Sequence, residues 1–383
     1  MPINSIRCVF MRGGTSKALI FRRDDLPSDQ AQWDSIFLAA MGSPDPNGRQ
    51  LDGMGGGISS LSKVCVVGRT SHPEADVDYT FAQIGTNTAT VDYGGNCGNM
   101  SSAIGPFAVD EGMVCEQADG IATVRIHNTN TGKIIIAQFP VSGGKAAVHG
   151  EQVIDGVAGS GAPIRLEFRQ VAGSRTGVLL PTGRSQDCLQ LPSGKTVRVS
   201  LVDAANPCVF VAAEDLGLNG SESAEQLQSM PELMVIMENL RRQSSIKMGL
   251  ATDLESAALS RSVPFIGIVA KPRAWRTQSG VDMQSCDADL SVRMLSSGSP
   301  HRAIPVTSAL CVAVASRTPG SVAAQCVGVT DGPIRIGHSS GTIMVEAQMD
   351  YVRGEVLHAS VYRTARRLFH GEVLYLKNVG EES

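Results

Sequence analysis

Short runs rich in β-branched residues recur through most of this chain, and Gly, Pro, Asn or Asp bounds each of them. Runs of this length and composition are typical of β-strands, and the residues that bound them favour turns. We therefore expect many short strands rather than long helices. The clearest runs are residues 64–67, 77–84, 124–128, 133–139, 197–202, 265–270, 343–347 and 356–362.

Helical patterns are rarer and lie between the predicted strands. Residues 29–41 place four apolar side chains on one face, and residues 230–242 begin with Pro231 in the first turn. Two further helices, built of small residues that allow close packing, are expected after Cys97 and after His301. Strands and helices do not alternate regularly in this order, which predicts an α+β fold rather than a doubly wound sheet.

The length of 383 residues suggests two or three domains. The turn Pro181-Thr182-Gly183 separates two strand-rich blocks of similar size. We therefore expect a boundary there, with an N-terminal half of residues 1–182 and a C-terminal half of residues 183–370.

Charge and hydropathy argue against nucleic acid and membrane as partners. The 33 basic and 37 acidic residues give a net charge of −4, and no more than two Lys or Arg stand side by side. The longest apolar stretch, residues 303–315, is interrupted by Pro305 and falls short of the roughly 18 residues that a bilayer span needs. Nine scattered cysteines without a C-x-x-C pair, together with an N-terminus unlike a secretory signal, predict reduced thiols and a cytoplasmic location.

The histidine pattern predicts no metal site. The seven histidines lie far apart, none forms an H-x-x-x-H pair, and none lies within four residues of a cysteine.

The first candidate binding segment is residues 12–17, with two glycines, two hydroxyls and two cations between strand-like runs. Backbone N–H groups and hydroxyls in such a loop can hold a carboxylate or phosphate, although the spacing is not that of a P-loop. Thr15, Ser16 and Lys17 are the expected contacts. A hairpin turn with solvated charges is the alternative.

The second candidate is Lys63, which follows the glycine loop 53–57 and Ser62 and directly precedes a buried strand. A desolvated amine can lose its proton near neutral pH and act as a base. The alternative is a surface lysine at a strand edge.

The third candidate is Cys97, within Asn96-Cys97-Gly98-Asn99 at the start of a predicted helix. The helix dipole stabilises a thiolate at that position, and the neighbouring glycines allow a substrate to approach the backbone. A structural buried thiol is the alternative.

The second half contributes weaker candidates. Asn206 ends a strand-like run, His301 precedes the small-residue helix, and residues 337–341 form a loop rich in donors. Together they would match the anion-holding groups of the first half, whereas each histidine alone is more typical of a hydrogen-bonded structural residue.

The chain carries a series of short motifs at residues 11–17, 42–45, 51–56, 62–63, 75–79, 96–99, 181–183 and 363–366. Together, and in order from about residue 6 to residue 375, they resemble the PrpF family of isomerases. That family includes 2-methylaconitate cis-trans isomerase, methylitaconate Δ-isomerase and 4-oxalomesaconate tautomerase. The resemblance implies a diaminopimelate-epimerase-like fold of two pseudo-symmetric halves, each a curved sheet around a central helix, and leaves open that a strand near residues 371–383 joins the first half.

The resemblance also implies a reaction that needs no metal or organic cofactor, a 1,3-allylic proton shift in an unsaturated di- or tricarboxylate. It leaves open whether the protein forms a homo-oligomer. The family's S-K motif carries its catalytic lysine, which corresponds to Lys63, and its N-C-G-N motif carries a cysteine, which corresponds to Cys97. The substrate-binding residues expected on this basis and from the loops above are Thr15, Ser16, Lys17, Ser62, Asn96, Gly98, Asn99, Asn206, His301 and Ser308.

The resemblance does not select one substrate. Residues 127–133 and 201–208 look most like the methylitaconate branch, and residues 42–56 look like the 2-methylaconitate branch. A 4-oxalomesaconate tautomerase, a non-catalytic carboxylate-binding protein and an amino-acid epimerase remain as alternatives. Epimerase relatives use a second cysteine that would fall near Pro305, where this chain has none, although Cys311 lies six residues on.

Overall fold

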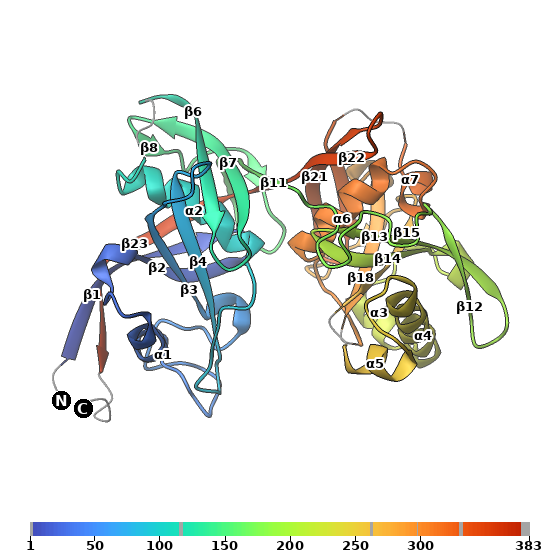
Figure 1. The fold of residues 1–383 in the computed structure, drawn as a ribbon, viewed down its shortest axis with the longest axis horizontal. Coiled ribbons are helices and arrows are strands. Elements are labelled where there is room, and N and C mark those ends of the chain that lie inside the picture. The colour runs from blue at the N-terminus through green and yellow to red at the C-terminus, as the bar shows by residue number, and fades with distance from the viewer. Residues whose placement is uncertain (1–2, 115–117, 261–262, 297, 329–331, 377–383) are drawn as a thin grey trace. The chain divides into compact units, whose positions relative to one another are not determined.

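A computed structural model describes residues 3–114, 118–260, 263–296, 298–328 and 332–376, which form two compact units (Figure 1). Unit 1 comprises residues 1–167 and 363–383, and unit 2 comprises residues 168–362. The chain leaves unit 1 before the turn at residues 181–183 where we expected the boundary, and β11 (Ile164–Arg169) still pairs with β7 (Lys133–Ser142). Residues 377–383 of the expected C-terminal strand lie outside the described residues.

The sheet of unit 1 has the strand order β23-β1-β2-β3-β4-β6-β7. Its neighbours are antiparallel except for two parallel pairs, β2 with β3 and β4 with β6. The strands are β1 (Ile3–Gly13), β2 (Ser16–Arg22), β3 (Lys63–Arg69), β4 (Val77–Ile84), β6 (Gly120–Asn128) and β23 (Ala365–Leu376), with the short strands β5 (Val91–Asp92), β8 (Lys145–Ala146), β9 (Gln152–Val153) and β10 (Ser160–Gly161).

Helix α2 (Gly98–Asp110) lies at the centre of unit 1, and its residues 100–109 are all buried (Figure 1). It packs against β1, β2, β3, β6 and β7. A Cβ on Gly105 would lie 2.7 Å from the ring of Phe139, so only a small residue allows the strands to approach this closely. The other helix, α1 (Trp33–Met41), packs Phe37 into a core that includes Phe21 of β2.

The sheet of unit 2 has the order β12-β13-β14-β15-β18-β20-β21-β22. Its central helix is α6 (Val306–Arg317), which packs against β13, β14 and β21, while α3, α4 and α5 gather together elsewhere in the unit (Figure 1). The remaining bounds are β12 (Asp187–Gln190), β13 (Thr196–Ala204), β14 (Asn206–Ala212), β15 (Phe265–Ala270), β16 (Trp275–Arg276), β17 (Asp282–Met283), β18 (Leu290–Ser296), β19 (Ser299–Pro300), β20 (Ile334–His338), β21 (Gly341–Asp350), β22 (Glu355–Arg363), α3 (Ala224–Gln228), α4 (Pro231–Lys247), α5 (Leu254–Leu259) and α7 (Val322–Cys326).

One pattern of strand pairing occurs in both units. The pairs β1–β2, β2–β3, β3–β4, β4–β6 and β6–β7 are antiparallel, parallel, antiparallel, parallel and antiparallel. The pairs β13–β14, β14–β15, β15–β18, β18–β20 and β20–β21 follow the same sequence. In each unit the central helix leads into the second strand of the second parallel pair. The two halves are therefore pseudo-symmetric in topology.

An ion pair repeats with this topology. Asp76 directly precedes β4 and accepts from Arg125 of β6, with 2.6 Å between Nη2 and Oδ1. Asp289 directly precedes β18 and accepts from Arg335 of β20, with 2.8 Å between the same atoms. Each pair thus joins the ends of two strands that run parallel.

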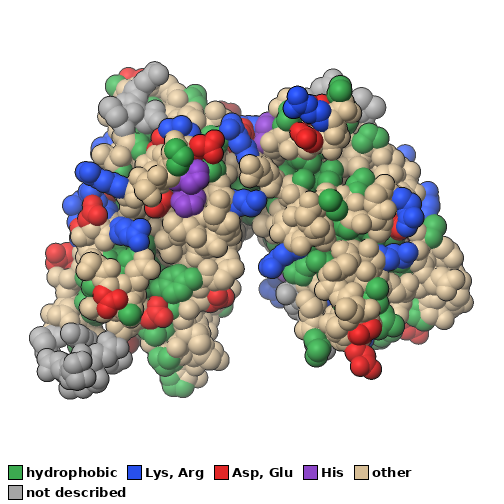
Figure 2. Space-filling model, viewed as in Figure 1, with side chains coloured by type: hydrophobic (Ala, Val, Ile, Leu, Met, Phe, Trp, Pro, Cys, Tyr) green, Lys and Arg blue, Asp and Glu red, His purple; other side chains and the backbone are tan. Residues whose placement is uncertain are grey.

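The α+β fold is confirmed, and every predicted strand lies within an observed one. The helix expected over residues 29–41 begins later, because residues 30–32 form a 3₁₀ turn and Asp29 accepts from the N–H of Ala31. Among the described residues no helix is long and apolar enough to cross a bilayer. On the face drawn in Figure 2, charged side chains of both signs are interspersed.

Candidate active site

Lys63 is the first residue of β3, between two neighbouring strands. It pairs with Ala18 of β2 and with Gln83 of β4, and only 7% of its surface is exposed. Its Nζ donates a hydrogen bond to Oε1 of Gln83 and lies 5.1 Å from the centroid of the Phe81 ring. Lys63 is therefore a buried amine and not a solvated lysine at a strand edge.

The glycine loop before Lys63 has a structural role. The N–H groups of Met54 and Gly55 donate to the carbonyls of Ala40 and Met41 at the end of α1. The N–H of Gly57 donates to Oε1 of Gln50, so all three N–H groups are already hydrogen-bonded to acceptors of unit 1.

Ser62 completes the same loop. Its hydroxyl is fully buried, 2.5 Å from Oε1 of Gln50 and 2.9 Å from the carbonyl of Ile58. These contacts fix the backbone immediately before Lys63. A direct contact of Ser62 with substrate stays a prediction.

Cys97 occupies the N-cap position of α2, and its side chain makes no capping hydrogen bond. The N–H groups of the first turn, which begins with Gly98 and Asn99, have no partner within the helix. Ser101 donates to the carbonyl of Cys97 at 3.1 Å and lies 3.3 Å from Oδ1 of Asn96, which holds the segment against the helix. The thiol of Cys97 is partly exposed at the positive end of the dipole.

The loop of residues 12–17 is tied to the start of α2. Gly14 and Thr15 form the turn between β1 and β2, and Gly14 has a φ of +51°, which glycine adopts without strain. Asn99 donates from Nδ2 to Oγ1 of Thr15 at 3.1 Å and accepts at Oδ1 from Nε of Arg363 at 3.2 Å. Because Thr15 accepts this bond, its hydroxyl proton stays available to a ligand.

The two other residues of that loop differ in exposure. Ser16 is buried, whereas Lys17 is half-buried with its Nζ 5.5 Å from the centroid of the Phe10 ring.

The sequence motif of residues 363–366 did not indicate a role for Arg363. In the structure this arginine is hydrogen-bonded to Asn99 at the start of α2. Burial lowers the pKa of this guanidinium to about 10, a value at which it is still cationic at neutral pH. Arg12 braces the same loop by donating to the carbonyls of Gly14 and Thr364. The two arginines place positive charge beside the loop that carries Thr15.

Two polar groups behind the site stay protonated. Tyr79 is fully buried, and its hydroxyl lies 3.9 Å from Sγ of Cys65. Burial, together with the nearby Cys97, raises the pKa of Tyr79 and of Cys65 well above their usual range, and Cys65 adds to the shift of Tyr79. Cys65 is therefore an inert core thiol.

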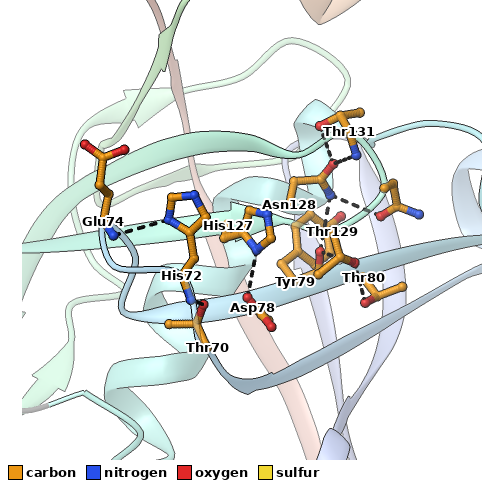
Figure 3. Close-up of polar contacts among 11 residues, drawn as sticks. Thr70, His72, Glu74, Asp78, Tyr79, Thr80, His127, Asn128, Thr129 and Thr131 are labelled. Atoms are coloured by element: carbon orange, nitrogen blue, oxygen red, sulfur yellow. Dashed lines mark hydrogen bonds and ion pairs between the residues drawn. The ribbon is translucent and has the colours of Figure 1, made fainter.

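Strand β4, which carries Phe81 and Gln83, is held by the loop that follows β6. In Figure 3, Asn128 reaches towards Tyr79 and Thr131, and its Nδ2 lies 3.1 Å from Oδ1 of Asn130. Asn130 accepts from the N–H of Phe81 at 2.8 Å and donates to its carbonyl at 2.9 Å, as a neighbouring strand would.

A histidine pair lies near the start of β4, with His72 in the loop before that strand and His127 on β6. The rings of His72 and His127 stack with centroids 4.8 Å apart, and Nδ1 of His127 lies 2.8 Å from the carboxylate of Asp78 (Figure 3). Nδ1 of His72 accepts from the N–H of Glu74, so each ring has a structural partner.

The predicted residues of the second half lie in unit 2. Asn206 begins β14, and its side chain bonds to the carbonyl of Pro207 at 3.2 Å. His301 stacks on Phe265, and burial lowers its pKa, which favours the neutral ring. Ser308 lies in the first turn of α6, and its buried hydroxyl has no partner among the described residues.

Pro305 is the N-cap of α6 and thus holds the position that Cys97 holds in unit 1. Cys311 is fully buried within α6 and donates to the carbonyl of Val202 at 3.5 Å. Burial and the neighbouring Cys208 raise its pKa well above the usual range. Among the described cysteines, none therefore lies at the start of this helix.

Comparison with known proteins gives a family and several relatives. The family model described as PrpF protein matches residues 3–376. The chain is 41% identical to 3-methylitaconate isomerase of Eubacterium barkeri, over 96% of both chains, and 38% identical to 4-oxalomesaconate tautomerase of Pseudomonas putida, over 96% of this chain and 95% of that one. The crystal structure of a methylitaconate-delta-isomerase superimposes with a TM-score of 0.91 at 40% identity, covering 98% of this chain and 96% of that one.

Proposed function

Because this chain belongs to the PrpF family and is an isomerase, we propose that it catalyses a cofactor-independent 1,3-allylic proton shift in an unsaturated di- or tricarboxylate. The observation that carries the proposal is the buried amine of Lys63, whose acceptor is the neutral amide of Gln83. A buried amine with no carboxylate partner among the described residues is suited to act as a base.

Lys63 would supply both proton transfers. Its free amine removes a proton from the allylic carbon, and the C–H electron pair becomes part of a dienolate delocalised into the carboxylate. The resulting ammonium then returns a proton from one of its three N–H bonds to the far end of the allyl unit. The double bond moves by one position, and no atom is gained or lost. Positive groups and donors that are already in place stabilise the dienolate charge.

Substrate carboxylates would bind at the start of α2. The first-turn N–H groups, beginning with Gly98 and Asn99, and the hydroxyl of Thr15 supply donors, and Arg363 adds charge behind Asn99. Cys97, at the same helix start, would act as a partner acid on the opposite face of the substrate or hold the substrate in place.

Methylitaconate is our first candidate substrate, with 2-methylaconitate and aconitate next. The similarity to the Eubacterium barkeri enzyme supports this choice. A 4-oxalomesaconate tautomerase is the second candidate, supported by the Pseudomonas putida relative. An amino-acid epimerase has less support, since Pro305 stands where a second thiol would be needed.

The test is NMR in deuterated water with methylitaconate, trans-aconitate and 4-oxalomesaconate. We expect deuterium incorporation and a shifted double bond for one of them, abolished by Lys63→Ala and retained by Lys195→Ala, which removes an exposed lysine of unit 2. Normal turnover by Lys63→Ala would refute the lysine mechanism. Tight binding without exchange across the panel would instead favour a non-catalytic carboxylate-binding protein.

A further inference from the structure

We infer that Gln83 is a positioning residue that holds the amine of Lys63 by an uncharged contact, an inference that rests on the function proposed for that lysine. The two residues lie directly across from each other in the antiparallel pair β3–β4. Nζ of Lys63 donates to Oε1 of Gln83.

The side-chain amide of Gln83 has one orientation that satisfies its surroundings. Its Nε2 lies 3.0 Å from the carbonyl oxygen of Ser59, 3.0 Å from that of Ser62 and 3.3 Å from that of Ile84. All three are acceptors, so Nε2 is the donating end and Oε1 faces the amine. The backbone just before Lys63 and the residue that follows Gln83 therefore fix the group that the amine meets.

The contact is neutral, which matters for a base. A carboxylate in this place would stabilise the ammonium form, whereas an amide oxygen positions the nitrogen without adding charge. The ring of Phe81 lies near the same nitrogen. Asn130 binds both backbone groups of Phe81, so the strand segment that carries Gln83 is anchored independently of the lysine.

The strand pairing is repeated in unit 2, but the positions equivalent to Lys63 and Gln83 hold other residues there. Ala18 pairs with Lys63 in the parallel pair β2–β3, and Cys208 pairs with Phe265 in the corresponding pair β14–β15. The pairing of Ile266 with Leu295 then places Ser296 across from Phe265, where unit 1 has Gln83. At the equivalent positions, both of which the structure describes, unit 2 thus has neither the amine nor the amide.

The test is the pH profile of kcat/KM, read by NMR with the substrate that the wild type turns over. In Gln83→Glu the added carboxylate stabilises the ammonium form. We expect the acidic limb to move up by at least about one pH unit, with activity at pH 7 falling about tenfold and recovering at higher pH. In Gln83→Met, a side chain of similar length without an acceptor, the ammonium loses its partner, so the limb moves to lower pH and kcat falls. Gln190→Glu, the same change on an exposed strand residue of unit 2, should match the wild type.

The inference is supported if the acidic limb moves to higher pH in Gln83→Glu and to lower pH in Gln83→Met. The effect of a purely structural role would not change direction with the charge of the new side chain. Melting temperatures identify a variant that fails to fold, in which case the other variant decides. Wild-type profiles in the folded variants, or a loss of activity uniform across pH, would overturn it. In either case an inactive Lys63→Ala leaves the proposed function standing, whereas normal turnover by Lys63→Ala refutes the lysine mechanism itself.

Discussion

Cys97 and Pro305 occupy equivalent positions in the two units, each as the residue immediately before the buried central helix. The strand pairings around the two helices follow the same order, so the difference lies in the side chains and not in the backbone plan. Proline has no titratable group and no N–H. Among the described residues, the start of the central helix therefore carries a thiol in unit 1 and none in unit 2. This difference supports the proposed allylic proton shift over a two-thiol epimerisation.

We expect Cys97→Ala to lower kcat by at least about 100-fold if the thiol transfers a proton, since general acid–base groups contribute roughly that much. Cys311→Ala should retain turnover and lose only stability, because that thiol is buried against Val202. Steady-state kinetics and thermal melting of the two variants make the comparison. A Cys97→Ala variant with wild-type kcat and a raised KM would show that the thiol only positions substrate.

Asn99→Ala should weaken substrate binding, because Thr15 and Arg363 both bond to this side chain. A lost hydrogen-bonded anchor of about 1.5 kcal/mol corresponds to a rise in KM of roughly tenfold. Asn239→Ala, which removes the same side chain from α4, serves as the control. Unchanged KM for all substrates of the panel would contradict a binding role for this loop.

Gly53→Ala should destabilise unit 1, because a Cβ there would lie 2.1 Å from the backbone nitrogen of Gly42. Relief requires displacement of the loop from α1, at a cost of about 1–3 kcal/mol in the free energy of unfolding. Gly95→Ala is the matched control, since a Cβ at that position meets nothing within 4 Å. Denaturant unfolding of both variants measures the difference, and equal midpoints would show that the loop does not pack as described.

The repeated ion pairs predict a loss of stability in acid. Burial alone raises the pKa of Asp76 and of Asp289, but the hydrogen bonds and charge of Arg125 and Arg335 outweigh it, so both values are lowered. The stabilisation is therefore complete above the unfolded pKa of about 3.9 and is lost as the pH falls through the folded values. Unfolding free energies measured between pH 6 and pH 3 should fall less steeply in Asp76→Asn than in the wild type. Parallel slopes would mean that the pair contributes nothing to the acid dependence.

The sequence by itself determined the strands, the two small-residue helices and the chemical groups. Short β-branched runs between turn residues are local patterns, so each predicted strand lies within an observed one. Small residues predicted close packing, and Gly105 against Phe139 provides it. Lys63 and Cys97 could be proposed as candidates from the sequence because each stands at the start of an element, a position that sequence can reveal.

Only the tertiary structure decided which groups meet. The partnership of Lys63 with Gln83 depends on the register of two strands, and the link from Asn99 to Arg363 spans 264 residues of sequence. The hydrogen bonds between the glycine loop and the end of α1 likewise join segments that no local pattern connects. Residue types and local periodicity are written along the chain. Hydrogen-bond partners and burial arise only when distant segments pack together, and these decide whether a lysine is solvated or a base.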